Sequence, residues 1–116
     1  MPKANRVPLL PGTLEMLVLQ SLLFGSRHGH GIATTIQRTS DELLLVDHGS
    51  LYPALQRLER AGLIASAWGI SDNNRRARFY EITALGRKQL GAEASRWNRI
   101  AEAMHRILGP DYVRES

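Results

Sequence analysis

The residue types of a hydrolase triad stand close together in the segment Asp47-His48-Gly49-Ser50. A serine nucleophile needs its histidine base and its acid to be brought together by the fold, and adjacency in sequence does not supply that geometry. The chain also lacks the Gly-x-Ser-x-Gly segment that exposes a nucleophilic serine on a strand-to-helix turn. We therefore predict that the protein is not an enzyme.

Metal binding is the second chemistry that the residue types suggest. The chain has four histidines, which are His28, His30, His48 and His105. Only the first two are close in sequence, and neither a cysteine nor an ordered pattern of carboxylates accompanies them, as a zinc site would require. The absence of cysteine also excludes disulfide bonds and thiolate chemistry. We predict no metal site and no cofactor.

A third chemistry, recognition of nucleic acid, fits residues 49–64. The leucines of this segment repeat at i, i+4 and i+7, as Leu51, Leu55 and Leu58. They form one apolar stripe of a helix, and Gln56, Arg57 and Arg60 project from its other side. Such a helix suits insertion into the major groove of DNA. An ordinary amphipathic helix with a solvated face fits the same local pattern, so the rest of the chain has to decide.

Three residues are expected to set the limits of this helix. The Ser50 hydroxyl can accept an orphan backbone N–H as the N-cap. Pro53 then falls in the first turn, where its missing N–H costs little. Gly62 stands where a C-cap adopts the left-handed conformation. The helix is therefore expected to begin at Ser50 and to end before Gly62.

The bulk composition limits the class of protein. With 116 residues the chain holds one domain, or one small domain plus an extension. Its net charge is +4, its pI is about 10.1, and arginine supplies 13 of its 15 basic residues. Arginine makes planar, bidentate contacts with phosphate and guanine, so this balance favours a polyanionic partner. A high-GC genome would raise the arginine content in the same way.

No membrane or export segment is expected. The N-terminal segment Met-Pro-Lys-Ala-Asn-Arg lacks the apolar core of a signal peptide. No apolar run approaches the ~20 residues of a membrane span. The hydrophobic fraction of 43% excludes wholesale disorder. We predict a folded cytoplasmic protein.

Two helices are expected before residue 41. Residues 13–24 carry leucines on one broad face and predict a deeply buried helix that Gly25 ends. Residues 26–29 predict a turn, and residues 30–40 predict a second helix. The inner face of this second helix carries Ile32, Ala33 and Ile36. Residues 43–46 are a short apolar run that fits either a small strand or a buried turn.

After Gly62 the apolar pattern changes to a period of two. Residues 63–70 and 77–83 are predicted strands, and the polar residues 71–76 between them suit a hairpin turn. The expected inner residues are Trp68 with Ile70 and Tyr80 with Ile82. Arg78 shares the inner parity of its strand, so its stem is expected to pack while its charge reaches the edge.

Three helices followed by a hairpin with an arginine-rich tip is the element order of a winged helix-turn-helix. The predicted fold is therefore mainly α with a small β-hairpin. The third helix would read the groove, and the hairpin, as the wing, would lie along phosphates. The residues predicted to contact DNA are His48, Ser50, Tyr52, Gln56, Arg57, Arg60, Asn74, Arg75, Arg76 and Arg78.

The last long segment, residues 83–108, predicts a helix that Thr83 can cap. Its apolar positions are Leu90, Ala94, Trp97, Ala101, Met104 and Leu108. Their spacing alternates between four and three, which is a heptad seam of about two and a half repeats. A helix packed on its own domain fits this pattern too. Because the winged domain is already closed without it, we predict that the seam joins a second subunit.

The expected organisation has four parts. They are an N-terminal arm at residues 1–12, the winged helix-turn-helix domain at 13–83, a dimerisation helix at 84–108 and a tail at 109–116.

Several motifs of the chain resemble the PadR family of bacterial transcriptional regulators. They are Pro11-Gly12-Thr13-Leu14-Glu15, His28-Gly29-His30-Gly31-Ile32, Gly49-Ser50-Leu51-Tyr52-Pro53-Ala54-Leu55, Arg57-Leu58-Glu59, Gly62-Leu63-Ile64, Asn73-Asn74-Arg75-Arg76, Tyr80 and Thr83-Ala84-Leu85-Gly86. The resemblance covers roughly residues 9–108 and is closest to the short subtype, which has a single C-terminal helix.

The resemblance implies a homodimer whose last helices cross, and repression through a palindromic double-stranded operator. Many members release DNA when a small effector binds, often a phenolic or drug-like compound. The resemblance also implies that Tyr52 helps to position the recognition helix and that Ser50 and Arg57 lie near the DNA backbone. The wing arginines are expected at the groove or the phosphates.

The chain departs from the family pattern at two histidines. His30 stands where an aromatic residue is expected between two glycines, and His48 stands where many relatives of this subtype have an amide. The second departure changes any inherited base preference, since His48 can reach a phosphate or a base edge. In one branch of the family, paired tryptophans of the last helix enclose a flat ligand. Trp97 is placed to do this or simply to fill the dimer core.

The leading hypothesis is a homodimeric, DNA-binding transcriptional repressor that a small aromatic effector releases. The alternative is a winged-helix module that binds a protein and has no specific DNA site, because a fold alone does not determine function.

Overall fold

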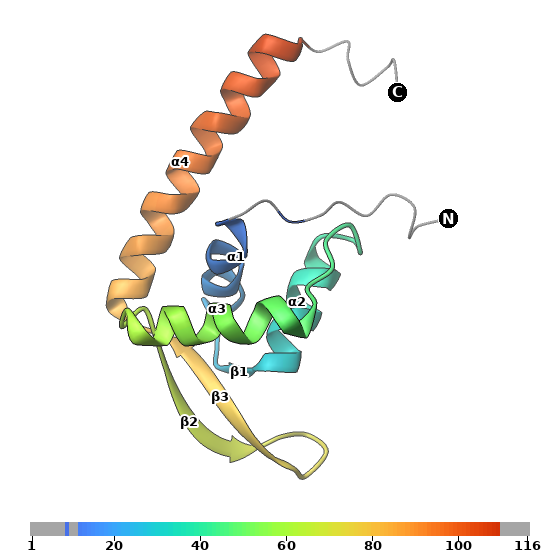
Figure 1. The fold of residues 1–116 in the computed structure, drawn as a ribbon, viewed down its shortest axis with the longest axis vertical. Helices are drawn as coiled ribbons and strands as arrows, with labels where there is room; N and C mark the ends of the chain where they lie inside the picture. The colour runs from blue at the N-terminus through green and yellow to red at the C-terminus, as the bar shows by residue number, and fades with distance from the viewer. Residues whose placement is uncertain (1–8, 10–11, 110–116) are drawn as a thin grey trace.

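The computed structural model of the chain describes residue 9 and residues 12–109. The expected arm and tail lie almost wholly outside the described residues. The elements are α1 (Thr13–Ser21), β1 (Arg27–His28), α2 (Gly29–Thr39), α3 (His48–Arg60), β2 (Ile64–Ile70), β3 (Arg76–Ile82) and α4 (Ala84–Leu108). Figure 1 shows α1, α2 and α3 packed together, the hairpin of β2 and β3 reaching away from them, and α4 rising on the opposite side. This is a winged-helix arrangement with a long C-terminal helix.

The small sheet has three antiparallel strands in the order β1-β3-β2. We expected a two-stranded hairpin and a turn at residues 26–29, so β1 is a correction. It pairs Arg27 with Tyr80 and His28 with Phe79. A strand of two residues is too short to show a period of two, and it becomes a strand only because β3 offers an edge.

The core lies between the three N-terminal helices and the base of the hairpin. Its fully buried side chains include Val18 and Leu19 from α1, Ile32 from α2, and Leu51 and Leu55 from α3. Ile64 of β2 and Tyr80 of β3 close the core from the hairpin side. The apolar periodicity therefore identified the inner faces of α2 and α3 correctly.

Helix α1 ends at Ser21, three residues before the end that its leucines suggested. Leu22 is still buried, at 2% exposure, although it lies in the following turn. The Nε–H of Arg27 donates to the Ser21 carbonyl over 2.8 Å, which satisfies a carbonyl that the helix end leaves free. The apolar pattern was correct about burial and wrong about where the helix stops.

The N-cap of helix α3 lies three residues earlier than predicted. The N-cap is Asp47, whose carboxylate accepts the Ser50 N–H over 2.8 Å. Ser50 is thus the third residue of the helix, and Pro53 lies inside it, beyond the first turn. The predicted cap at Ser50 is wrong because an aspartate three residues earlier supplies a stronger acceptor for the same helix end.

The predicted end of α3 at Gly62 is confirmed. Gly62 has φ 77°. Its N–H donates to the Glu59 carbonyl, and the Leu63 N–H donates to the Leu58 carbonyl, both over 3.0 Å. These two bonds form a Schellman motif, which turns the chain from the helix directly into β2.

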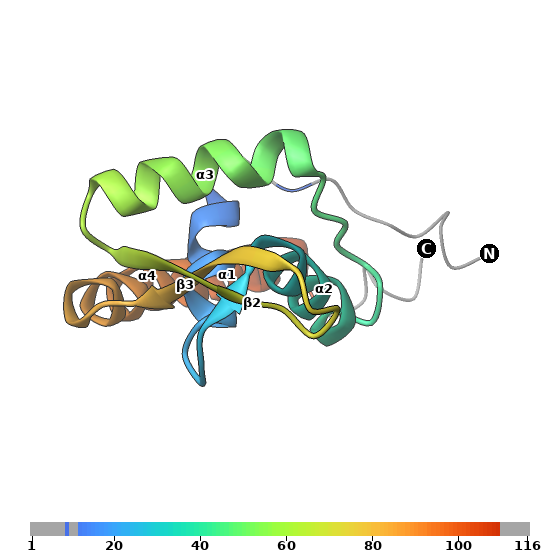
Figure 2. The same ribbon diagram turned by 90° about the horizontal axis from the view of Figure 1, so that it is seen from below.

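The predicted inner residues of the hairpin are buried only near its base. Tyr80 is 7% exposed, and Ile82 is partly buried. Trp68 and Ile70 are 57% and 64% exposed, so their predicted burial is wrong. Alternation identifies which residues share a face, but the distal half of the hairpin reaches away from the helices that would cover it (Figure 1). Figure 2 shows α3 lying along one side of the sheet. Residues 43–46 form neither a strand nor a helix, and only Val46 among them is buried.

Helix α4 is capped as predicted, because the Thr83 hydroxyl oxygen accepts the Gly86 N–H over 3.0 Å. Gly86 packs against the chain that leaves α3, and a Cβ atom placed there would lie 2.1 Å from the Leu63 carbonyl oxygen. Leu90, at 6% exposure, packs into the core beside α1. Past this point α4 leaves the body of the domain (Figure 1).

Among the described helices, none combines the length with the apolar content that crossing a membrane requires.

Candidate nucleic-acid interface

The recognition helix α3 presents a polar face to solvent. Its buried residues are Leu51, Ala54, Leu55 and Leu58. The residues farthest from them around the helix are Pro53, Gln56 and Arg60, and all three are exposed. Gln56 and Arg60 are therefore the predicted contact residues that extend farthest from the domain, as base readout requires.

One flank of α3 faces α2 and the wing. Tyr52 lies over Gly29 at the start of α2, where an added Cβ would be 2.7 Å from the tyrosine hydroxyl. His48 meets Tyr52 edge-on at 5.7 Å between ring centroids. Glu59, at the other end of this flank, accepts a hydrogen bond from the Ser66 hydroxyl of β2. Tyr52 is thus held against the start of α2, with the His48 ring beside it.

The opposite flank of α3 faces α1. Arg57 forms an ion pair with Glu15, in which Nη2 and Nε lie 2.8 and 2.9 Å from Oε2. Ser50, exposed on the same flank, donates its hydroxyl to Asp47 over 3.3 Å. Arg57 keeps 54% of its side-chain surface exposed. Because exposed ion pairs contribute only about 0–1 kcal/mol, this contact holds the Arg57 guanidinium only weakly.

Three histidines, His28 at the end of β1, His30 of α2 and His48 of α3, lie close together beside Tyr52, an arrangement that the sequence did not indicate. The His28 and His30 rings stack with their centroids 6.3 Å apart, and the His30 ring meets the His48 ring edge-on at the same centroid distance. His28 also caps α2, because its Nδ1 accepts the Gly31 N–H over 3.0 Å. Within the described residues, three or more histidine or carboxylate side chains do not converge as a metal site would need.

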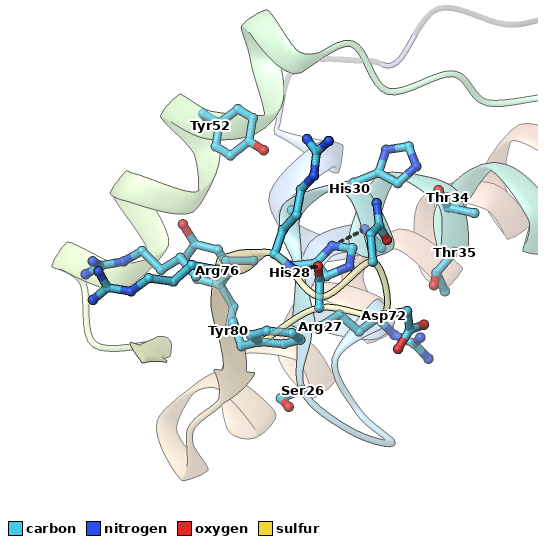
Figure 3. A pocket seen from close by; sticks show the side chains of 18 of the residues that line it. Ser26, Arg27, His28, His30, Thr34, Thr35, Tyr52, Asp72, Arg76 and Tyr80 are labelled. Carbon is cyan, nitrogen blue, oxygen red and sulfur yellow. Dashed lines mark hydrogen bonds between the residues drawn. The ribbon is translucent and has the colours of Figure 1, made fainter. Parts of the chain in front are cut away.

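A groove runs between the start of α2 and the wing. It is lined by His28, His30 and Tyr52 on one side and by the wing residues 71–73 and 75–80 on the other, as Figure 3 shows for the residues that it labels. Its charged lining comprises the arginines Arg27, Arg38, Arg75, Arg76 and Arg78, with Asp72 as the acidic residue. A polyanion that lay along this groove would meet an excess of positive charge.

The tip of the wing is held by a serine. The Ser71 carbonyl accepts the Asn74 N–H over 2.9 Å, and the Ser71 hydroxyl accepts the Arg75 N–H over 3.4 Å. Asn74 has φ 61°, a left-handed conformation that asparagine tolerates better than most residues. Asn74 therefore shapes the turn, and Arg75 is exposed directly after it.

Arg78 is tied to the recognition helix. Its Nε–H donates to the Ser66 hydroxyl over 2.9 Å, and its Nη2 lies 3.5 Å from Oε2 of Glu59 on α3. The guanidinium is thus bound by Ser66 and Glu59 at the exposed edge of the wing, where 44% of the Arg78 side-chain surface remains accessible. Burial raises the pKa of the neighbouring Tyr80 phenol above its ordinary value of 10.0, and the Arg78 charge partly opposes this rise.

Comparison of the sequence with models of known protein families identifies the family. A family model described as the transcriptional regulator PadR-like family matches residues 18–92. The chain belongs to this family. The PadR-like chain is thus a DNA-binding transcription regulator, as its recognition motifs indicated.

Solved structures of regulators and a curated relative are similar to this chain over most of its length. A transcriptional regulator from Clostridium thermocellum is 28% identical with a TM-score of 0.76, over 84% of this chain and 95% of that one. A PadR family regulator from Clostridium difficile is 27% identical with a TM-score of 0.73, over 84% of this chain and all of that one. An uncharacterized protein X from Lysinibacillus sphaericus is 29% identical, over 84% of this chain and 89% of that one.

The outer half of α4 in this PadR-like regulator carries a stripe of apolar side chains that its own domain does not cover. The predicted seam divides at Leu90, which packs inside its own domain, whereas the later large side chains of the seam remain exposed. Ala94 and Ala101 are partly buried, while Trp97, Met104 and Leu108 are 39%, 54% and 57% exposed. The sequence interpretation missed Ile100 and Ile107, at 45% and 79% exposure. They lie three residues after Trp97 and Met104, so they widen the same stripe.

Proposed function

We propose that the chain is a homodimeric transcriptional repressor that binds a two-fold symmetric operator in double-stranded DNA. The observation that supports it best is the pairing of an exposed Gln56–Arg60 face on α3 with an arginine-lined groove beside it. In this proposal α3 enters the major groove, and the groove beside the wing receives the phosphate backbone.

Within this proposal the predicted contact residues divide into two groups. Gln56 and Arg60 extend farthest from the domain and read bases, with His48 and Tyr52 at the flank. Phosphates are contacted by Ser50, Arg57, Asn74, Arg75 and Arg76. Arg78 adds to the positive electrostatic potential of the wing but does not contact DNA directly, since Ser66 and Glu59 already engage its guanidinium.

The dimer part of the proposal rests on the stripe of α4 from Ala94 to Leu108. Large apolar side chains that remain exposed along one helix are costly in water, and a second copy of the same helix would cover them. A two-fold dimer would present two recognition helices to two half-sites, which is why the operator is expected to be palindromic.

The effector part of the proposal places a flat aromatic compound at Trp97. The indole is 39% exposed in the single chain and lies within the apolar stripe, where two copies would face each other. A ligand between them would change the angle between the two α4 helices and with it the spacing of the recognition helices. DNA would then be released.

Selection of bound DNA from a random pool tests the proposal. We expect a palindromic consensus whose affinity falls steeply with salt, because each phosphate contact releases counterions. Gln56→Ala should relax base preference, whereas Arg75→Ala should weaken binding to all sequences alike. Repeating the selection with phenolic compounds tests effector release. If the selection yielded no consensus sequence, the result would instead favour a winged-helix module that binds protein.

A further inference from the structure

Trp68 is a large aromatic residue on the open part of the wing. It is 57% exposed and lies on the face of β2 that carries Ile64 and Ser66, beyond the point where the core ends. Leaving an indole in water forfeits the stabilisation that its burial would give. Core packing does not account for a tryptophan at this position, so its neighbours have to explain it.

Two arginines of β3 lie over the Trp68 ring. The guanidinium carbon of Arg76 is 4.7 Å from the ring centroid, and that of Arg78 is 5.6 Å away. Both distances are within the range of a cation–π interaction, for which tryptophan is the best aromatic partner. Arg78 is directly opposite Trp68 in the strand register, and Arg76 is two residues farther along the same face.

The two arginines differ in what else they contact. Arg78 is held by Ser66 and by Glu59 of the recognition helix. The Arg76 guanidinium has no hydrogen-bond acceptor among the described residues, so the Trp68 ring is what orients it. The chain of contacts runs from α3 through Glu59 and Arg78 to the ring, and from the ring to Arg76.

We infer that Trp68 is a positioning residue that holds Arg76 in place for a DNA phosphate. The inference rests on the proposed function. An arginine that is already ordered loses less conformational freedom on binding, and the electron-rich ring offsets the repulsion between two neighbouring guanidinium groups. The Arg78–Glu59 contact then sets where this prepared arginine stands relative to the helix that reads the bases.

The test is a double-mutant cycle on the full-length protein with its selected operator. Trp68→Ala should weaken binding about two- to five-fold, the range of an exposed cation–π contact, although it removes no charge. It should also lower the dependence of affinity on salt in the direction of Arg76→Ala. In the Arg76→Ala background, Trp68→Ala should cost nothing further, because it acts through Arg76.

Three variants control the cycle. Trp68→Phe keeps an aromatic face and should recover part of the affinity, while Trp68→Leu keeps apolar bulk without a π face and should not. Phe24→Ala removes an aromatic side chain that is 89% exposed in the turn after α1 and does not line the groove, so it should leave binding unchanged. Thermal unfolding of each variant shows whether the fold is intact.

Two outcomes would separate the inference from the function beneath it. If the wild-type protein binds its operator and the two substitutions add independently, Trp68 does not act through Arg76 and the inference is wrong. Equal affinity and salt dependence for Trp68→Leu and Trp68→Phe would also overturn it. Failure of the wild-type protein to bind any DNA would overturn the proposed function and the inference together.

Discussion

Single residues shape the flank of the recognition helix through close approach rather than through strong bonds. Gly29 lets the Tyr52 ring lie directly on the start of α2, and His48 then packs against the other edge of that ring. The position of Tyr52 beside the groove therefore depends on the absence of a side chain on a different helix. Pattern within α3 could not indicate this, because the glycine is 23 residues away in the chain.

Gly29→Ala should weaken operator binding about ten-fold with a smaller effect on stability. The new methyl group would lie 2.7 Å from the Tyr52 hydroxyl and displace the ring from the groove. Gly31→Ala is the matched control, since its methyl group would make an ordinary contact 3.4 Å from the His28 ring. Gel shifts and thermal unfolding of both variants give the comparison, at about 1.4 kcal/mol for each ten-fold change. Equal binding by the two variants would contradict the role given to Gly29.

At the scale of elements, the junction of α3, β2 and α4 holds the domain and the long helix together. The Thr83 hydroxyl donates to the Gly62 carbonyl over 2.7 Å, and the Thr83 N–H donates to the Leu63 carbonyl over 3.1 Å. Gly86 packs against that same carbonyl in the first turn of α4. The end of the recognition helix and the start of the C-terminal helix are thus one connected structure.

Gly86→Ala should therefore lower the free energy of unfolding by about 3 kcal/mol, the upper part of the range for overpacking. The added Cβ would meet the Leu63 carbonyl oxygen at 2.1 Å, and that oxygen belongs to backbone that cannot move aside. Gly91→Ala, in the same helix, has open space around its new methyl group and should instead stabilise by about 0.5–1 kcal/mol through helix propensity. Urea denaturation measures both, and a change of the same sign in the two variants would refute this account of the junction.

Tyr80 should make the hairpin base sensitive to alkali. Burial raises its pKa above 10.0, so between that value and its folded-state pKa the native protein retains a proton that the unfolded chain has lost. The free energy of unfolding therefore holds its full value, as far as Tyr80 affects it, below pH ~10, and it falls as the pH rises through this window. Tyr80→Phe removes the titrating group and should flatten this decline. Denaturation of both proteins between about pH 9 and 11.5 would show it, and parallel curves would argue against a buried phenol.

At the scale of the whole molecule, α4 connects the packed winged domain to a stripe of exposed apolar side chains. Its first turns belong to the core through Gly86 and Leu90, and its outer turns expose Trp97, Ile100 and Ile107. A rigid helix that is anchored at one end transmits any change at its outer contact to the winged domain. This is the geometry that the proposed effector response would use.

Trp97→Asp should give monomers on a sizing column and weaken operator binding at least 100-fold, because a charge in the apolar contact would be desolvated without a partner. Arg99→Asp, on an exposed position of the same helix, is a charge-changing control that should remain dimeric. A stable dimer of the Trp97→Asp protein would show that the outer stripe of α4 is not the subunit contact.

The amino-acid sequence by itself determined the number and order of the helices, the inner faces of α2 and α3, the left-handed Gly62 and the Thr83 cap. These features depend on neighbours within a few residues, so they are readable from local spacing. Tertiary structure decided what depends on distant partners. It placed Asp47 rather than Ser50 at the helix start, brought three histidines together and paired β1 with β3. It also engaged Arg57 and Arg78 with acids from other elements, and it left Trp68 outside the core. Alternation assigns a side chain to a face of a strand, but only the packed fold decides whether anything covers that face.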